Sequence, residues 1–378
     1  MAGIYIHIPF CKSKCNYCDF YSETAHNKNI IDNYIIALQK EIDLRISYLQ
    51  NSEIETIYFG GGTPSVLSAS QINSVFDKIN DSFPISKNLE FTFEANPDDI
   101  NLSYLESLKI HTKVNRLSIG LQSFFEDDLK LMNRRHNALQ SKNAIRDAQK
   151  VGFDNISGDL IYGLPKMTNQ KWEQNLDVFF ELNIQHLSAY HLTYESGTQF
   201  YKWLKNKEIS EIPENNSIEQ FEILMKKAEE NNFIHYEISN FAKHNFLSKH
   251  NSNYWNRVKY MGLGTSAHSY NGTEREWNIT NISKYIDSVF ANKVPSEKEI
   301  LSLQDKLNEY IMTSLRTLAG VDFDYIKNNF EQNNVIDIET KLNKKIETEL
   351  IQKTNNFYSL TQKGKFISDS IILDLFVI

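Results

Sequence analysis

The sequence predicts an α/β fold: an open, partial (β/α)6 TIM-like barrel followed by a smaller, mostly helical, winged-helix-like C-terminal domain. Three observations lead to this prediction. Short apolar runs typical of strands alternate six times with segments of helical periodicity over residues 4–193. Such alternation implies a parallel sheet with right-handed crossovers. Polar or glycine-rich motifs follow the runs, as in barrels whose chemistry lies at the carboxyl ends of the strands.

The barrel elements are expected in strict alternation. The six strands cover residues 4–8, 54–59, 89–94, 116–121, 155–161 and 186–193. The helices that follow them cover residues 29–49, 70–79, 102–108, 126–132, 138–151 and 170–182. Six units rather than eight make the barrel open.

The remainder of the chain is less regular. Residues 195–214 are polar and lysine-rich, and precede an expected helix over 217–231 and one further strand over 235–242. The C-terminal part is expected to contain helices over 282–290, 305–318 and 338–354 and a short strand pair near 357–360. We therefore expect three parts: a barrel (1–240), a connecting segment (241–280) and a C-terminal helical domain (281–378).

Length and charge exclude several classes of protein. The chain has 378 residues and a formal net charge of −8, which argues against a general nucleic-acid binder because such proteins need a basic face. No run of about 18 apolar residues could form a transmembrane helix. No targeting segment fits in front of Cys11, so we expect a cytoplasmic protein.

All three cysteines of the chain lie directly after the first strand, as Cys11, Cys15 and Cys18 in the spacing C-x-x-x-C-x-x-C. Three thiolates on one loop suit a 4Fe–4S cluster, which usually takes four, so one iron would stay open to a ligand. An odd number of cysteines argues against a disulfide network. Zinc bound by the cysteines and His7 or His26 is the main alternative, although structural zinc sites usually pair two C-x-x-C knuckles. Unliganded thiols are the third interpretation.

The cysteine spacing after a strand resembles the signature of the radical S-adenosylmethionine (SAM) superfamily. The fuller string Tyr-Ile-His-Ile-Pro-Phe-Cys, with Cys-Asp-Phe at residues 18–20, is similar to the oxygen-independent coproporphyrinogen III oxidase-like family, and most similar to its haem chaperone subgroup. The resemblance implies that SAM binds the open iron and that the reduced cluster cleaves it to a 5′-deoxyadenosyl radical. In the oxidases this radical starts the decarboxylation of a propionate side chain.

The same resemblance implies a set of SAM-contacting residues: Tyr5, Tyr17, Gly61, Gly62, Thr63, Glu94, Gln122, Arg134 and Asp159. The glycine turn would meet the amino group of SAM, and Glu94 would meet its ribose. Taken singly, each residue fits a tight turn or a surface polar group equally well. Their shared position at the strand ends favours one site. Arg135 competes with Arg134 for its role.

Two departures from the oxidases favour the haem chaperone subgroup. Phe20 stands where the oxidases carry a fourth cysteine, and only ten residues precede Cys11. The first hypothesis is therefore a haem chaperone that binds haem and passes it to acceptor proteins, with a SAM-liganded 4Fe–4S cluster. The alternatives are a radical SAM coproporphyrinogen oxidase and a zinc-bound structural protein. Enzyme activity stays open, and we assign no catalytic residue.

Expected partners follow from the resemblance. They are haem, haem-accepting proteins and an electron donor, and we also consider a peripheral membrane contact and a homodimer. His250 opens an H-N-x-x-Y-W motif that is associated with the chaperone subgroup. An imidazole can ligate haem iron, so His250 is the candidate haem ligand. A hydrogen-bonded structural histidine is the alternative, and His7, His191 and His268 compete as ligands.

Overall fold

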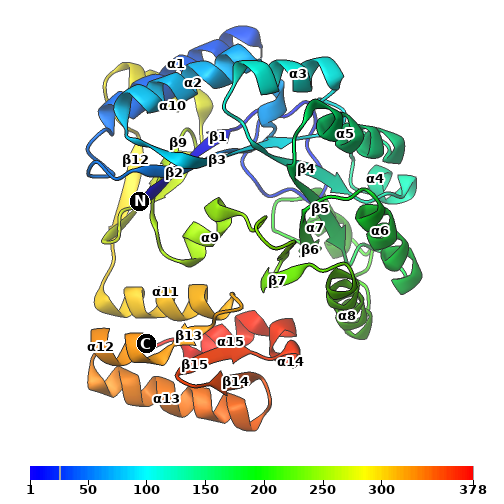
Figure 1. The fold of residues 1–378 in the computed structure, drawn as a ribbon, viewed down its shortest axis with the longest axis vertical. Coiled ribbons are helices and arrows are strands. Elements are labelled where there is room, and N and C mark those ends of the chain that lie inside the picture. The colour runs from blue at the N-terminus through cyan, green and yellow to red at the C-terminus, as the bar shows by residue number, and fades with distance from the viewer. Residues whose placement is uncertain (25–26, 378) are drawn as a thin grey trace.

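The computed structural model describes residues 1–24 and 27–377 and contains one large curved sheet with a smaller unit below it (Figure 1). The first six strands are parallel neighbours in chain order. They are β1 (Ala2–Ile8), β2 (Ile54–Gly61), β3 (Ile85–Ala95), β4 (Arg116–Gln122), β5 (Asn155–Tyr162) and β6 (His186–His191). Consecutive order with parallel pairing confirms the six predicted β/α units.

Helices cover the outer face of this sheet (Figure 1). They are α1 (Lys28–Leu44), α2 (Ala69–Ser82), α3 (Leu102–His111), α4 (Glu126–Leu131), α5 (Ala138–Val151), α6 (Asn169–Glu181) and α8 (Glu214–Glu230). Side chains in the preceding loops cap most of them; Ser68 and Asn137 form complete capping boxes with a glutamine three residues later. A short 3-10 turn, η1 (Pro64–Val66), follows β2, and α7 (Gln199–Lys205) lies in the polar excursion.

The sheet continues beyond the six units at both edges, to twelve strands in all. One edge adds β9, parallel to β1, and then three antiparallel strands: β9 (Lys259–Leu263), β10 (His268–Tyr270), β11 (Glu274–Asn278) and β12 (Ser296–Ile300). The other edge adds the antiparallel strands β8 (Asn240–Ala242) and β7 (Ile234–Glu237). The single strand predicted over 235–242 is therefore wrong. The chain reverses there because the Glu237 carboxylate accepts hydrogen bonds from Ser239 and Asn240.

The predicted domain boundary at residue 281 is also wrong. Helix α10 (Ile282–Phe290) packs against α1, and its Tyr285 hydroxyl donates to Glu41 Oε2 at 2.6 Å. Its buried side chains belong to the core of the large sheet, and β12 is part of that sheet. A second core begins only with Leu307.

We call residues 303–375 the C-terminal unit. It contains α11 (Leu303–Leu315), β13 (Val321–Asp322), α12 (Phe323–Asn329), α13 (Gln332–Glu347), β14 (Ile351–Thr354), β15 (Phe357–Leu360), α14 (Gln362–Phe366) and α15 (Ser368–Leu375). The three strands form one small sheet, in keeping with the winged-helix-like prediction. The helix predicted over 338–354 ends early because Glu349, at φ 60°, closes it. Leu350 N–H then donates to Lys345 O at 2.9 Å.

Helix α9 (Lys249–Trp255) lies on the inner side of the sheet, between β2 and α11 (Figure 1). The C-terminal unit joins the barrel at β7, where Ile238 N–H donates to Arg316 O and Leu318 N–H donates to Tyr236 O. Phe366 packs edge-on against Phe221 of α8, with ring centroids 5.1 Å apart. In the described part of the chain, no helix combines the length and apolarity needed to span a bilayer.

Candidate functional site

A single cavity of about 930 Å³ occupies the carboxyl ends of the barrel strands. Its lining includes all three cysteines and eight of the nine predicted SAM-contacting residues: Tyr17, Gly61, Gly62, Thr63, Glu94, Gln122, Arg134 and Asp159. The cavity reaches from the cysteines to the C-terminal unit, which contributes Arg316 and Lys365 to its wall. Its volume lies at the upper end of the range typical of small-molecule sites.

The three cysteines lie on a loop whose two ends are fastened together. We call residues 10–23 the cysteine loop. Glu23 N–H donates to Pro9 O at 2.8 Å, and Cys11 N–H donates to Glu23 O at 3.1 Å. In the middle of the loop, the Asn16 side chain donates to Leu131 O at 2.8 Å, next to the end of α4. The loop is therefore held at both ends and near its middle, and all three cysteines line the cavity.

Two of the thiols receive hydrogen bonds from side chains outside the cysteine loop, one after β2 and one between α4 and α5. Thr63 Oγ1 donates to Cys11 Sγ at 3.3 Å, and Arg134 Nη1 donates to Cys15 Sγ at 3.4 Å. Donors of this kind stabilise the thiolate, which is the form that binds metal. Burial, and then the neighbouring thiols, raise the pKa of Cys18 to about 11. A metal centre bound by Cys18 would therefore displace its proton.

The donor set fits a 4Fe–4S cluster better than a single zinc ion. Among the described residues, no three His, Cys, Asp or Glu side chains lie close enough together to hold one metal ion, whereas the thiolates of a cluster bind different irons. His7 is unsuited as a zinc ligand, because its Nε2 contacts Tyr21 O at 3.0 Å and its Nδ1 contacts the Tyr5 hydroxyl at 3.3 Å. Burial lowers the pKa of His7 to about 4. The other candidate, His26, lies outside the described residues.

The turn after β2 is shaped by its glycines. Gly61 has φ +105°, and a Cβ there would lie 2.6 Å from the His7 ring. A Cβ on Gly62 would lie 2.8 Å from Ile8 O and 3.1 Å from Cys11 Sγ. Both positions therefore require glycine, one for its backbone conformation and both for space. The backbone at this turn comes within reach of anything bound beside Cys11.

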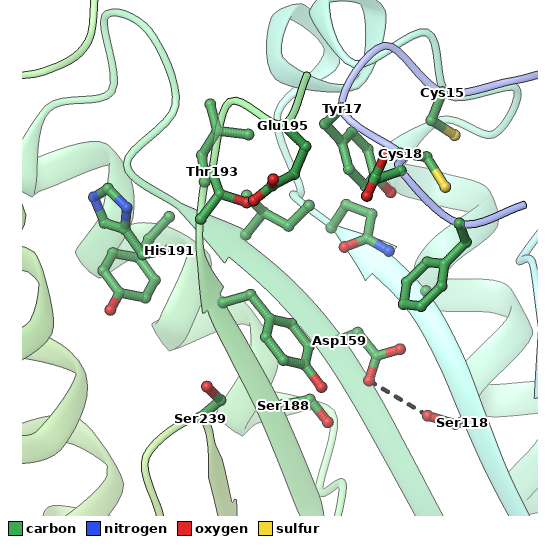
Figure 2. Close-up of a pocket in the computed structure, with 18 of the residues that line it drawn as sticks. Cys15, Tyr17, Cys18, Ser118, Asp159, Ser188, His191, Thr193, Glu195 and Ser239 are labelled. Carbon is green, nitrogen blue, oxygen red and sulfur yellow. Dashed lines mark hydrogen bonds between the residues drawn. The ribbon is translucent and has the colours of Figure 1, made fainter. Parts of the chain in front are cut away.

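Glu94, at the end of β3, is held by two donors. Tyr58 hydroxyl donates to its Oε1 at 2.7 Å, and Gly61 N–H donates to its Oε2 at 3.1 Å. Burial raises the pKa of Glu94 to about 7. Asp159, within β5, accepts from Ser118 Oγ at 3.4 Å (Figure 2), and burial raises its pKa to about 6. Two carboxyl groups with raised pKa values thus line the same cavity, as is common at functional sites.

A hydrogen-bond chain connects two of the cysteines. Arg134 Nη2 donates to Asn96 Oδ1 at 2.5 Å, and Asn96 Nδ2 donates to Thr63 Oγ1 at 3.1 Å. Arg134 and Thr63 in turn donate to Cys15 and Cys11. The competing Arg135 instead forms ion pairs with Asp98 and Asp99. The structure therefore places Arg134, and not Arg135, at the cavity.

Asn96 and Arg116 are among the cavity-lining residues that the sequence prediction did not name as site residues. In the sequence, Asn96 stands out only because it follows a predicted strand. Arg116 is 1% exposed and lines the cavity; its Nη1 lies 3.5 Å from Thr92 Oγ1, and its Nε has no hydrogen-bond partner in the described residues. In the sequence, the feature that could have indicated Arg116 is its charge, because it is the first residue of a strand whose other residues are uncharged. Tyr5, in contrast, was expected to contact SAM, but its side chain lies outside the cavity lining, next to His7 and Tyr58.

His250 also lies outside the cavity lining. Its Nδ1 contacts Thr56 Oγ1 at 2.8 Å, and its Nε2 contacts the Tyr254 hydroxyl at 3.0 Å. The ring is 2% exposed and stacks on Tyr58, and burial lowers its pKa to about 3. With both nitrogens engaged, this geometry favours the structural role over haem ligation. From the H-N-x-x-Y-W motif, the residue that lines the cavity is Asn251.

His191 is the histidine of the cavity. It is exposed at the end of β6, and its Nε2 contacts Ser217 Oγ at 3.0 Å. Figure 2 shows His191 on one side of the cavity and Cys15 and Cys18 on the other. His268 lies outside the cavity lining and stacks on Trp277.

Comparisons with known proteins show the family of this chain. The family model described as the radical SAM superfamily matches residues 5–179, and the one described as the HemN C-terminal domain matches residues 301–367. The haem chaperone HemW of Bacillus subtilis is 34% identical over 373 residues, which cover 98% of both chains. The haem chaperone HemW of Escherichia coli is 30% identical over 382 residues, 99% of this chain and 98% of the relative.

The fold has a solved counterpart. Coproporphyrinogen III oxidase (HemN) from Escherichia coli, described as a radical SAM enzyme, superposes with a TM-score of 0.85. The match covers 100% of this chain and 90% of that chain at 21% sequence identity. This likeness shows a shared fold that includes the C-terminal unit.

Proposed function

Because the chain belongs to the haem chaperone HemW family within the radical SAM superfamily, we propose that it binds haem and passes it to acceptor proteins, while it holds a SAM-liganded 4Fe–4S cluster. One observation carries the proposal. A single cavity runs from three converging cysteines to an outer part between the barrel and the C-terminal unit. The inner part suits the cofactors, and the outer part leaves room for a cargo.

In this proposal, Cys11, Cys15 and Cys18 hold the cluster. The SAM site is formed by the cavity-lining residues at the strand ends: Tyr17, Gly61, Gly62, Thr63, Glu94, Gln122, Arg134 and Asp159. When bound, the reduced cluster supplies an electron that can cleave SAM. The chain's own contribution is placement: Thr63 and Arg134 orient two thiols, and Glu94 stands fixed between two donors.

We further propose that the cargo binds in the outer part of the cavity, which we define by His191, Ser217, Phe221, Arg316 and Lys365. His191 is the axial-ligand candidate that the geometry supports, because its imidazole is exposed to the cavity. An imidazole is a common ligand of haem iron. This assignment replaces His250, which is buried and lies outside the cavity lining.

The function is tested with anaerobically reconstituted protein. We expect about four irons and matching sulfide per chain, stoichiometric haem binding, and transfer of that haem to an apo-acceptor. With SAM, a reductant and coproporphyrinogen III, we expect no protoporphyrinogen IX. Turnover of coproporphyrinogen III would instead assign the oxidase activity, and a single zinc in place of iron would refute the cluster.

A further inference from the structure

Lys365 is a half-buried cation that faces the outer part of the cavity from the C-terminal unit. Its Nζ contacts His235 Nδ1 at 3.1 Å, and within the described chain no carboxylate lies within ion-pair distance of it. Lys171, which lies against the barrel, is by contrast paired with Asp127 and Asp128. Burial lowers the pKa of Lys365. Lys365 is therefore a cation that lacks an anionic partner.

Arg316, at the end of α11, adds a second cation to the same wall. Its Nη1 donates to Asp369 Oδ1 at 2.6 Å, and its guanidinium lies 5.6 Å from the Trp255 ring centroid. The Asp369 side chain is 79% exposed, so water weakens this ion pair. A guanidinium has five donors, which leaves Arg316 capacity for a second carboxylate.

The rest of the outer cavity lining differs in character. It offers apolar and aromatic surface from Tyr162, Ile218 and Phe221, and the acidic residues Glu195 and Glu214. The two acidic residues would repel the carboxylate side chains of a ligand with a flat apolar body. Its carboxylates would point toward the C-terminal unit.

We propose that Lys365 and Arg316 form a carboxylate-binding subsite for a tetrapyrrole, and that this subsite orients the cargo with its carboxylate side chains against the C-terminal unit. This subsite rests on the proposed function, because it assumes that a tetrapyrrole is the ligand of the outer cavity. The chemistry it uses is shared by haem and by metal-free porphyrins that carry carboxylates.

The test compares Lys365→Met with Lys363→Met. Lys363 is an exposed residue of the same helix whose Nζ contacts only Thr348 O, at 3.4 Å. The full chain is titrated with haem and with haem dimethyl ester, whose carboxylates are masked, and the Soret absorbance is followed. Lys365→Met should weaken haem binding roughly tenfold to a hundredfold, the usual effect of losing a charge-assisted hydrogen bond. It should leave ester binding unchanged, and Lys363→Met should change neither.

Equal binding of haem by the wild type and Lys365→Met would overturn the subsite, as would equal weakening for haem and its ester. Arg316→Gln is the second variant, with the same expectation, should Lys365→Met melt below the assay temperature.

Coproporphyrin III, which carries four carboxylates, separates this proposal from the chaperone function. If the wild type binds coproporphyrin III in a Lys365-dependent way but does not bind haem, the chaperone function fails and the subsite stands. If haem binds with no dependence on Lys365, the subsite fails and the chaperone function stands. If the wild type binds neither ligand, both are overturned.

Discussion

At the scale of single residues, His191 and His250 differ in their exposure. The His250 ring is 2% exposed and lies outside the cavity lining, whereas the His191 ring is exposed to the cavity, with Ser217 and the Leu192 backbone as its hydrogen-bond partners. We expect His191→Ala to weaken haem binding and to shift the Soret band, because the iron loses its axial ligand. His250→Ala should keep the wild-type spectrum.

The cost of His250→Ala should appear in stability instead. The Thr56 and Tyr254 hydroxyls would lose their buried partner, so the free energy of unfolding should fall by roughly 2–3 kcal/mol. Urea unfolding measures this fall, and haem spectra are taken at a temperature where the variant is folded. A lost Soret band in folded His250→Ala would return the ligand role to His250.

Glu94 gives a second prediction at this scale. Its pKa is about 7 in the folded chain, above the ordinary value, so the folded state holds a proton that the unfolded state has released. The free energy of unfolding should therefore fall as pH rises from about 4.5 to about 7, by roughly 3 kcal/mol from this group.

Glu94→Gln should remove that part of the pH dependence. Its absolute stability changes too, because an amide oxygen cannot replace both carboxylate oxygens toward Tyr58 and Gly61, so the slope is the diagnostic quantity. Urea unfolding of the cluster-free chain at pH 5, 6, 7 and 8 measures it. Parallel pH profiles for the wild type and the variant would mean that Glu94 is ionised normally in the folded chain.

At the scale of elements, the turn after β2 combines backbone conformation with close packing. Gly61→Ala would place a side chain at φ +105° and 2.6 Å from the His7 ring. We expect it to cost roughly 3 kcal/mol of stability and to lower the iron content after reconstitution, because the turn carries Gly62 and Thr63 against Cys11.

Gly152→Ala is the matched control. Gly152 ends α5 at φ +90°, and a Cβ there would meet nothing within 4 Å. This variant should cost only roughly 1 kcal/mol and keep full iron content. If both variants lost stability equally, the close packing on His7 would have no energetic effect.

Elements set by local pattern could be predicted, and those set by distant pairing could not. The cysteine spacing and the six strand ends are local, so the sequence indicated which residues would meet at the rim. β9 escaped prediction because its place is decided by pairing with β1, more than 250 residues earlier. The helix predicted through residue 354 stopped at Glu347 because a non-glycine residue, Glu349, adopts the left-handed conformation.

The residues of the site also fall into those that a local motif indicates and those that depend on the three-dimensional structure. Gly61, Glu94 and Arg134 belong to motifs visible in the sequence, and all three line the cavity. Asn96 and Arg116 depend on three-dimensional placement, in a hydrogen-bond chain and in the barrel interior, and so left almost no local signal. The H-N-x-x-Y-W motif indicated an important segment but could not say which way His250 points.

At the scale of the whole molecule, the cavity has two ends built from different parts of the chain. The cysteine loop and the ends of β2 to β5 form the inner end, and β6, α8 and the C-terminal unit form the outer end. Among the hydrogen bonds of the described residues, none joins His191 or Lys365 to the cysteine loop. Cluster binding and haem binding should therefore be separable.

Cys15→Ala tests this separation. The variant loses one of the three proposed cluster ligands and the acceptor of the Arg134 hydrogen bond, so iron content after reconstitution should fall close to zero. Haem affinity should stay within about twofold of the wild type, because sites without shared partners couple weakly. Ser13→Ala, in the same loop and cavity, is the control and should keep both. Loss of haem binding together with iron would mean that the cluster, or the order it imposes on the loop, forms part of the cargo site, and the two-ended description of the cavity would have to be abandoned.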